Sequence, residues 1–455
     1  MLDITLFQTE KGGNPELIRQ SQIKRGAKPE TVDEIIALYT AWTKLKFDLD
    51  NFNRDINATQ KLIGQKYKAK EDASELVATK EELVRKKEQC IAAEVEAKQV
   101  LDNKLKVIGN LVHDSVPVSL TEDDNLMVAT NNTAGEPVKV DGILSHHELL
   151  YRIGGYDPER GTKVASHRGY FLTGVGVELN MAIINYGMRF LNEREFKLMQ
   201  TPFFMKRSLM AKTAQLEDFD EALYKIVDNA ADDQDEKYLI ATSEQPISAY
   251  HSGEWVNESE LPLKYGGYST NFRKEAGKHG KDTWGIFRVH QFEKLEQLVF
   301  TEPEKSWAMH EEMLRNAEEF NQSLGLKYRV INIVSGALNN AAAKKYDLEA
   351  WFPYQGEYKE LVSASNCTDY QSRPLEIRCG SKKLNETEKR YVHCLNATLS
   401  ATGRTICAIL ENWQTPTGVK IPPVLVPYMG GKTHLPFVRD MPAPPTGAAT
   451  KAKKK

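Results

Sequence analysis

Apolar residues recur every three or four positions through residues 35–63, and this stripe constrains the fold more than any other feature of the sequence. An uninterrupted stripe of about four heptads is typical of a helix in a coiled coil. We expect this helix to end at Gly64 and a polar turn to follow at residues 66–72. The members of the stripe are Ile35, Leu38, Trp42, Leu45, Leu49, Phe52, Ile56, Thr59 and Ile63, of which only Thr59 is off type.

A second, less regular helical pattern follows the turn. Asp72 or Ser74 is expected to cap it, because a short side-chain oxygen accepts a free backbone N–H at a helix start. Two helices of similar length joined by a turn predict an antiparallel hairpin over residues 35–108. Periodicity leaves two roles open for the hairpin, a dimerisation or spacer element and an arm that contacts a distant partner. Its apolar heptad positions are Leu76, Leu83, Cys90 and Ala97, its charged ones Lys80, Lys87 and Glu94, and the stripe returns at Leu101, Leu105 and Ile108.

The rest of the chain predicts an α+β domain. Residues 117–138 are polar and turn-rich, which indicates a linker. Short β-like runs then follow one another with few helical patterns between them, which favours an antiparallel sheet with helices on one side. We expect domains at residues 1–118 and 119–440, and a disordered basic tail at residues 441–455. The β-like runs are residues 238–242, 285–289, 298–301 and 328–334, and the helical patterns are residues 180–191 and 304–324.

Composition and cysteine usage exclude several classes of protein. The chain has 455 residues and a formal net charge of -3. It contains no apolar run near the ~18 residues that a membrane-spanning helix requires, and its start lacks the basic and apolar regions of a secretory signal. The five cysteines include no CxxC pair. We therefore expect a cytoplasmic protein with free thiols, no structural zinc and no membrane partner.

No glycine-rich phosphate-binding motif is found in the sequence. Residues 429–433 read Met-Gly-Gly-Lys-Thr, but Val426 stands where a P-loop requires its first glycine. Side chains must therefore hold any bound nucleotide. Residues 272–294 place two arginines, a carboxylate and an aromatic ring around a polar loop with Gly277, His279 and Gly280. Guanidinium groups bind phosphate and a ring stacks on a purine, although an ordinary solvent-exposed hairpin fits the same pattern.

Three charged residues stand in apolar surroundings. Glu296 and Glu360 lie within strand-like runs, where a core-facing carboxylate is costly unless it is paired or bound to a cation. Arg404 follows a glycine at the start of an apolar helical run. All three are candidate functional residues.

These residues carry a resemblance to the seryl-tRNA synthetases of the eukaryotic cytosolic type. Residues 272–275 (Phe-Arg-Lys-Glu) with residues 287–288 resemble motif 2 of the class II synthetases, and residues 398–404 resemble motif 3. The helix ending at Pro202 resembles motif 1. The serine-specific signals are residues 242–246 (Thr-Ser-Glu-Gln-Pro), residues 360–371 and the hairpin itself. The resemblance runs from the first residues to about Val438.

The resemblance implies roles for individual residues. Arg273 would hold the α-phosphate of ATP and Arg404 the γ-phosphate, and these two are the expected catalytic residues. Glu360 and Ser363 would bind Mg²⁺ through oxygen atoms, which this hard cation prefers. The implied ATP-binding residues are Arg273, Lys274, Glu275, Arg288, Val289, Phe292, Glu360, Leu361, Val362, Ser363 and Arg404. The implied serine-binding residues are Thr242, Ser243, Glu244, Arg273, Glu296, Asn396 and Thr398.

The implied reaction is the ATP-dependent attachment of L-serine to tRNA(Ser) through a seryl-adenylate, with tRNA(Sec) as a second acceptor where it exists. The partners would be ATP, L-serine, tRNA(Ser) bound through the 35–108 hairpin, and a second copy of the chain in a homodimer. Two other interpretations remain, an enzyme that loads activated serine onto another acceptor and a non-catalytic RNA-binding protein of this fold. The intact hairpin argues against the first, and the charged residues kept in apolar strands argue against the second.

Overall fold

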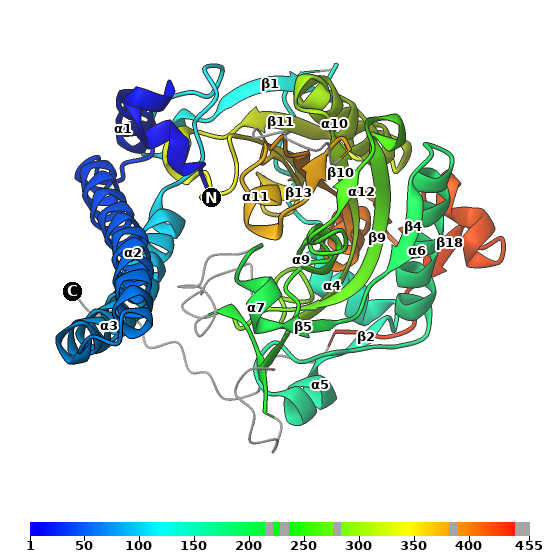
Figure 1. The fold of residues 1–455 in the computed structure, drawn as a ribbon. Helices are drawn as coiled ribbons and strands as arrows, with labels where there is room; N and C mark the ends of the chain where they lie inside the picture. Colours follow the sequence, from blue (N-terminus) through cyan, green and yellow to red (C-terminus); the bar gives the residue numbers. More distant parts are fainter. Residues whose placement is uncertain (134, 214–221, 228–235, 276–283, 382–388, 442–455) are drawn as a thin grey trace, which may run out of the picture. The chain divides into compact units, whose positions relative to one another are not determined.

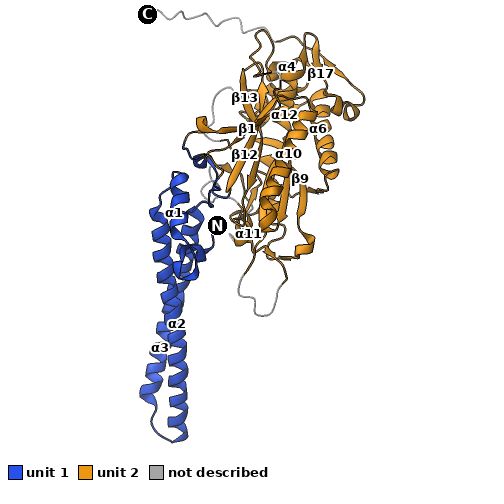
Figure 2. Ribbon diagram, turned by 90° about the horizontal axis from the view of Figure 1, so that it is seen from above, with its two compact units in different colours: residues 1–114, 118–120, 335–341 blue, residues 115–117, 121–334, 342–455 orange. Residues whose placement is uncertain are grey.

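The computed structural model describes residues 1–133, 135–213, 222–227, 236–275, 284–381 and 389–441. The chain divides into two compact units (Figure 2). The first, here called the arm unit, comprises residues 1–114, 118–120 and 335–341. The second, the sheet unit, comprises residues 115–117, 121–334 and 342–455. From position 442 onward, the predicted basic tail lies outside the described residues.

Two long helices form the predicted hairpin of the arm unit. α2 (Glu30–Lys68) and α3 (Ser74–Val107) lie side by side along their length, and α1 (Pro15–Lys24) precedes them (Figure 2). Every member of the predicted stripe in α2, from Ile35 to Ile63, is buried or half-buried. The heptad pattern is therefore confirmed as the seam between the two helices.

The predicted end of the first helix is wrong, because α2 continues through Gly64 to Lys68. Glycine costs a helix about 1 kcal/mol relative to alanine. Ile63 is only 4% exposed, and its packing requires the helix to continue here. At the start of α3 the N-cap position is Ala73, and the carboxylate of Asp72 accepts the N–H of Ser74 at 3.0 Å.

A polar contact explains how α3 accommodates charged heptad positions. Trp42 Nε1 donates to Glu94 Oε1 at 2.6 Å. The ammonium groups of Lys46 and Lys98 lie 4.9 and 5.5 Å from a Trp42 ring centroid. A cation near an aromatic face is attracted by the ring quadrupole. This cluster favours the register in which Trp42 of α2 lies beside Glu94 and Lys98 of α3.

Within the described residues, an eight-stranded sheet organises the sheet unit (Figure 1). Its strand order is β1-β11-β12-β13-β15-β10-β9-β4, and neighbouring strands are antiparallel except for β4 and β9. The sheet confirms the predicted α+β fold class. The strands are β1 (Leu126–Thr130), β4 (Lys197–Gln200), β9 (Leu263–Phe272), β10 (Gln291–Thr301), β11 (Tyr328–Asn332), β12 (Lys344–Phe352), β13 (Glu357–Asn366) and β15 (His393–Ala401).

Long helices cover one face of this sheet. α6 (Val175–Asn192), α10 (Ser306–Ser323) and α12 (Thr402–Trp413) share one apolar core with the sheet. Leu295 and Val299 of β10 point into that core, whereas Leu298 and Phe300 belong to a second core. Since successive side chains of a strand point to opposite faces, the two cores lie on opposite sides of β10.

Several predicted boundaries are wrong. Residues 285–289 form turns rather than a strand, because Gly285 has a φ of 62°, and β10 begins only at Gln291. The motif 1 helix ends at Asn192 and β4 separates it from Pro202. The expected linker contains the edge strand β1, and β7 ends at Leu239 rather than at position 242.

Shorter elements complete the sheet unit. No helix among the described residues is long and apolar enough to cross a lipid bilayer. The shorter helices are α4 (His146–Arg152), α5 (Pro158–Ala165), α7 (Arg207–Met210), α9 (Glu244–Ser248) and α11 (Ser372–Leu375). The shorter strands are β2 (Tyr156–Asp157), β3 (Phe171–Leu172), β5 (Phe204–Lys206), β6 (Lys225–Ile226), β7 (Lys237–Leu239), β8 (Trp255–Val256), β14 (Arg378–Cys379), β16 (Gln414–Thr415), β17 (Gly418–Lys420) and β18 (His434–Pro436).

Candidate active site

The polar candidates gather on the face of β10 and β15 that lies away from the long helices. Glu296 of β10 is paired with Thr398 of β15, whereas Leu295 is paired with Ser400. Leu399 is therefore the extra residue of a β-bulge, where two residues of one strand oppose one of the other. The bulge leaves Leu399 in the apolar core and Thr398 beside Glu296.

Glu296 is the centre of a buried hydrogen-bond network. Its Oε1 lies 2.6 Å from Lys294 Nζ, and its Oε2 accepts from Thr242 Oγ1 and Ser243 Oγ at 2.6 Å each. The backbone N–H of Glu244 donates to the same oxygen at 3.2 Å. Burial alone would raise the pKa of Glu296, but Lys294 and the two hydroxyls outweigh it and hold the pKa below its ordinary value. Glu296 is thus a fixed negative charge with acceptor capacity left on Oε1.

Glu244 lies beside this network, and its pKa is shifted in the opposite direction from that of Glu296. Its Oε1 accepts from Gln371 Nε2 at 2.8 Å and from Asn396 Nδ2 at 3.1 Å. Burial, followed by the nearby charge of Glu296, raises the pKa of Glu244. A cationic group bound next to this carboxyl would favour its ionised form.

Two members of these networks, Lys294 and Gln371, were not among the predicted site residues. Lys294 stands two residues before Glu296, and this spacing in a strand places both side chains on one face. That signal was present in the sequence. Gln371 lies 127 positions from Glu244 along the chain, so no local pattern indicates their contact.

The two predicted catalytic residues form a cationic pair. Arg273 Nε donates to the Ala241 carbonyl at 3.3 Å, and its guanidinium lies 5.2 Å from the ring centroid of Phe292. Burial and then the charge of Arg404 lower the pKa of Arg273. The nearby carboxylates of Glu275, Glu360 and Glu296 act in the opposite direction, so the positive charge is partly balanced before a ligand binds. The two guanidinium groups are suited to binding a polyanion such as a triphosphate.

Arg404 lies in the first turn of α12 and is held from two sides. Its Nη1 donates to the Glu360 carbonyl at 2.9 Å and lies 3.3 Å from the Glu360 carboxylate. Its guanidinium is 4.8 Å from the ring centroid of Phe287. These contacts fix the direction of the arginine before any ligand binds.

The two ends of the motif 2 segment are tied together beside these arginines. Arg288 Nη1 donates to Glu275 Oε2 at 3.0 Å, and Arg168, which the sequence analysis missed, lies 3.9 Å from the same oxygen. Lys274 donates its backbone N–H to the carbonyl of Ala222 at 3.0 Å. Val289 is buried in the core, so only its backbone remains a candidate for ligand contact. The predicted loop glycines and histidine, at positions 277, 279 and 280, lie outside the described residues.

The predicted Mg²⁺ ligands lie on β13 next to Arg404. The side chain of Glu360 is 47% exposed, so the expectation of a core-facing carboxylate is wrong here. Desolvation would raise the pKa of Glu360, but Arg404 and other cations outweigh it and hold the pKa below its ordinary value. Asp347 of β12 is paired with Ser363, has one buried carboxylate oxygen without a hydrogen-bond partner, and burial raises its pKa to about 7. Oxygen donors of this kind fit Mg²⁺, which takes few protein ligands when phosphates supply the rest.

Like that of Val289, the side chains of two other predicted ATP-binding residues are not available to a ligand. Leu361 and Val362 are 3% and 1% exposed and belong to the large apolar core, because β13 carries a bulge against β12 here. Only their backbone remains a candidate for contact with ATP. In the described part of the chain, no group of three or more His, Cys, Asp or Glu side chains is arranged to hold a metal.

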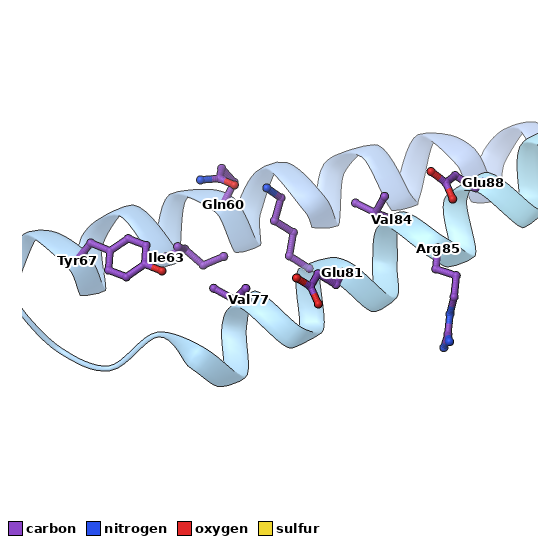
Figure 3. A pocket seen from close by; sticks show the side chains of 9 residues that line it. Gln60, Ile63, Tyr67, Val77, Glu81, Val84, Arg85 and Glu88 are labelled. Atoms are coloured by element: carbon purple, nitrogen blue, oxygen red, sulfur yellow. The ribbon is translucent and has the colours of Figure 1, made fainter.

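The arm unit has a separate pocket of about 470 Å³ between α2 and α3 near the hairpin turn. Figure 3 shows apolar side chains of both helices facing each other along it, with Arg85 directed outward. Tyr67 at its end is 63% exposed. An exposed aromatic ring next to cationic side chains can contact nucleobases and phosphates. The lining residues are Gln60, Ile63, Tyr67, Val77, Lys80, Glu81, Val84, Arg85 and Glu88.

The antiparallel sheet and the segments that resemble motifs 2 and 3 are features of a class II aminoacyl-tRNA synthetase. Residues 224–413 match the family model of the class II synthetase core domain for Gly, His, Pro, Ser and Thr. Residues 1–112 match the model of the seryl-tRNA synthetase N-terminal domain.

Comparison with individual proteins narrows the class to one family. The cytoplasmic serine–tRNA ligase of Schizosaccharomyces pombe is 60% identical over 444 residues, which cover 97% of this chain and 98% of the relative. The chain belongs to the seryl-tRNA synthetase family, whose activity is the charging of tRNA with serine, and it is an enzyme of the serine–tRNA ligase type.

Two solved structures support the same assignment. The AMP complex of the cytoplasmic enzyme from Naegleria fowleri has a TM-score of 0.84 at 46% identity, over 96% of this chain and 99% of that one. The ATP complex of the seryl-tRNA synthetase from Pyrococcus horikoshii has a TM-score of 0.85 at 39% identity, over 96% of this chain and 100% of that one.

Proposed function

We propose that this enzyme activates L-serine with ATP and transfers the seryl group from a seryl-adenylate to tRNA(Ser), and to tRNA(Sec) where that tRNA exists. The observation that carries the proposal is the buried, ionised Glu296 close to the arginine pair. This arrangement joins a pocket for a small polar amino acid to a site for a polyphosphate.

In the first step, a carboxylate oxygen of serine bonds to the α-phosphorus of ATP while the bond to the leaving pyrophosphate breaks. Arg273 binds the α-phosphate and Arg404 the γ-phosphate, so that both stabilise the negative charge that develops during transfer. Phe292 stacks on the adenine, and Glu275, Arg288, Lys274 and the Val289 backbone complete the nucleotide site. Glu360 and Ser363 would hold Mg²⁺, which would supply further charge neutralisation.

Serine is selected by its hydroxyl group, which donates to the free acceptor position of Glu296 next to Thr398. Alanine would leave this buried acceptor unpaired, at a cost of about 1–3 kcal/mol. Glu244 and Thr242 bind the serine ammonium group, while Asn396 orients Glu244 and Ser243 orients Glu296. In the second step, the terminal adenosine of the tRNA takes the seryl group and AMP leaves.

The arm unit binds the tRNA, through contacts to the backbone and shape that weaken as salt increases. We place the enzyme in the cytoplasm as a homodimer, with domains at residues 1–118 and 119–440. The basic tail at residues 441–455 adds non-specific affinity for RNA. Sedimentation of the full chain measures the dimer directly.

Serine-dependent ATP–pyrophosphate exchange by the full-length enzyme tests the activation step. We expect exchange with serine and none with alanine, threonine, glycine or proline at saturating Mg²⁺. Glu296→Ala should lose most exchange and its selectivity, whereas Glu318→Ala, which removes a half-buried carboxylate of α10, should retain both. Unchanged discrimination against alanine in Glu296→Ala would contradict the serine assignment. A folded enzyme without exchange would favour the non-catalytic interpretation.

Charge reversal in the arm pocket tests the tRNA role. We expect Lys80→Glu with Arg85→Glu to reduce tRNA charging at least several-fold and to leave pyrophosphate exchange unchanged, because the pocket lies in the other unit. Lys163→Glu, the same change on exposed α5, serves as the control. Normal charging by the arm variant at all salt concentrations would make the pocket irrelevant to tRNA binding.

A further inference from the structure

A buried histidine connects the motif 3 helix to the segment that returns from motif 2. His146 is the first residue of α4, whose start is fixed by a capping box between Ser145 and Glu148. Its Nδ1 lies 2.9 Å from Glu411 Oε1 in the last turn of α12, and its Nε2 lies 3.2 Å from the Trp284 carbonyl. His146 and Glu411 are 1% and 2% exposed.

We infer that His146 is a positioning residue for ATP: it holds residues 284–287 against α12 and thereby sets the place of Arg404. Both ring nitrogens of His146 face acceptor oxygens. Each contact is therefore a hydrogen bond only if a proton lies between that nitrogen and its partner. An apolar side chain of the same size could fill the space of the ring but could not form either hydrogen bond.

Glu411 is itself fixed, which makes the histidine contact a firm connection. Its Oε2 accepts the backbone N–H of Tyr354 at 3.1 Å, and its Oε1 also accepts the backbone N–H of His146 at 3.3 Å. The carboxylate thus joins three segments of the sheet unit. Removing one donor from a buried group of this kind leaves the remaining polar atoms unsatisfied.

The connection leads directly to the proposed γ-phosphate residue. The ring of Phe287 lies 6.3 Å from that of His146, and the guanidinium of Arg404 lies 4.8 Å from the Phe287 ring centroid. At the other end of α12, a Cβ on Gly403 would come within 3.0 Å of the Ile286 carbonyl. Residues 284–287 are therefore held near both ends of α12. At one end Ile286 lies close to Gly403, and at the other end His146 connects Trp284 to Glu411.

The inference rests on the proposed role of Arg404. Two substitutions of His146 separate its contact with Glu411 from its contact with Trp284. Asn places an amide donor near the position of Nδ1, and Gln places one near the position of Nε2. His146→Asn should keep the bond to Glu411 and release Trp284, so we expect the KM for ATP in pyrophosphate exchange to rise about threefold to tenfold. His146→Gln should keep the bond to Trp284 and change the KM for ATP less. The KM for serine should stay unchanged in both.

Three further variants make the test decisive. His393→Asn applies the same change to a half-buried histidine that bonds Ser306 instead, and it should leave the KM for ATP unchanged. If a His146 variant does not fold, Glu411→Gln keeps an acceptor for Nδ1 and should raise the KM for ATP by a smaller factor. Arg404→Lys tests the proposed function itself, and it should raise the KM for ATP strongly.

The outcomes are distinguishable. A strong effect of Arg404→Lys with normal KM values for ATP in folded His146→Asn and Glu411→Gln would overturn the inference and leave the proposed function standing. No effect of Arg404→Lys would overturn the proposed role of that arginine. Equal rises in the KM values for ATP and serine would make His146 a purely structural residue and would also overturn the inference.

Discussion

The pairing of Lys294 with Glu296 yields a quantitative prediction about stability. The two side chains are 7% and 3% exposed and lie 2.6 Å apart. Removing one partner of a buried ion pair leaves an uncompensated charge, which costs about 3–5 kcal/mol. Because two hydroxyls and a backbone N–H remain bonded to Glu296, we expect Lys294→Met to lower the free energy of unfolding by about 3 kcal/mol, the low end of that range.

The double variant Lys294→Met with Glu296→Gln separates the charge from the packing. With both charges removed, a buried pair is often close to neutral in stability, so we expect recovery to within about 1 kcal/mol of wild type. Serine-dependent exchange should not recover, because the amide is a poorer acceptor for the serine hydroxyl than the carboxylate.

The loss of stability in Lys294→Met should also depend on pH. Because burial opposes the ionisation of Glu296, we expect the loss of Lys294 to raise the pKa of this carboxyl in the folded state. A raised carboxyl pKa means that the folded state loses stability as the pH rises through it. The deficit of Lys294→Met should therefore be smaller at low pH than at neutral pH.

Urea unfolding followed by tryptophan fluorescence measures these differences. Five of the six tryptophans lie in the sheet unit and only Trp42 lies in the arm unit, so the signal reports mainly the unit that carries the pair. A Lys294→Met enzyme as stable as wild type, or a double variant no more stable than the single one, would refute the argument.

Three other predictions follow from the site and the arm. Glu360→Gln should raise the Mg²⁺ concentration needed for half-maximal exchange, and an unchanged Mg²⁺ titration would remove Glu360 from the metal site. Because the pKa of Glu244 is raised, the KM for serine should increase as the pH is lowered below neutral, and Glu244→Gln should flatten this profile. Gly64→Ala should stabilise the arm unit by about 1 kcal/mol, since a Cβ there meets no atom within 4 Å; faster hydrogen exchange of the α2 and α3 amides than in wild type would contradict this.

The arm was predictable because its stripe repeats over many turns. A long apolar period can be read from the chain itself, because it indicates a helix with one apolar face before the partner of that face is known. Gly64 misled the prediction because a local helix penalty was weighed without the packing of Ile63 against α3. The opposite error occurred at residues 285–289, where Ile286, Phe287 and Val289 are buried in turns. A short apolar run does not distinguish a strand from a buried turn.

The site was predictable where charge stands in apolar surroundings, as at Glu296, which is 3% exposed. Its burial costs free energy, so the sequence alone indicates that it has a partner, and Lys294 two residues before it is that partner. Other contacts of the site come from distant parts of the chain. Gln371 and the pair of His146 with Glu411 are brought to their contacts by the sheet and its helices, and no local spacing encodes such long-range neighbours.

The β-bulge at Leu399 has a consequence for how the two halves of the proposed site are joined. Residues before the bulge include the proposed serine-binding residues Asn396 and Thr398, whereas residues after it lead into α12 and Arg404. The extra residue offsets the pairing of β15 with β10 by one position. A one-residue shift of register moves side chains to the opposite face of a sheet. Deletion of Leu399 would therefore change the alignment of one half of the proposed site relative to the other.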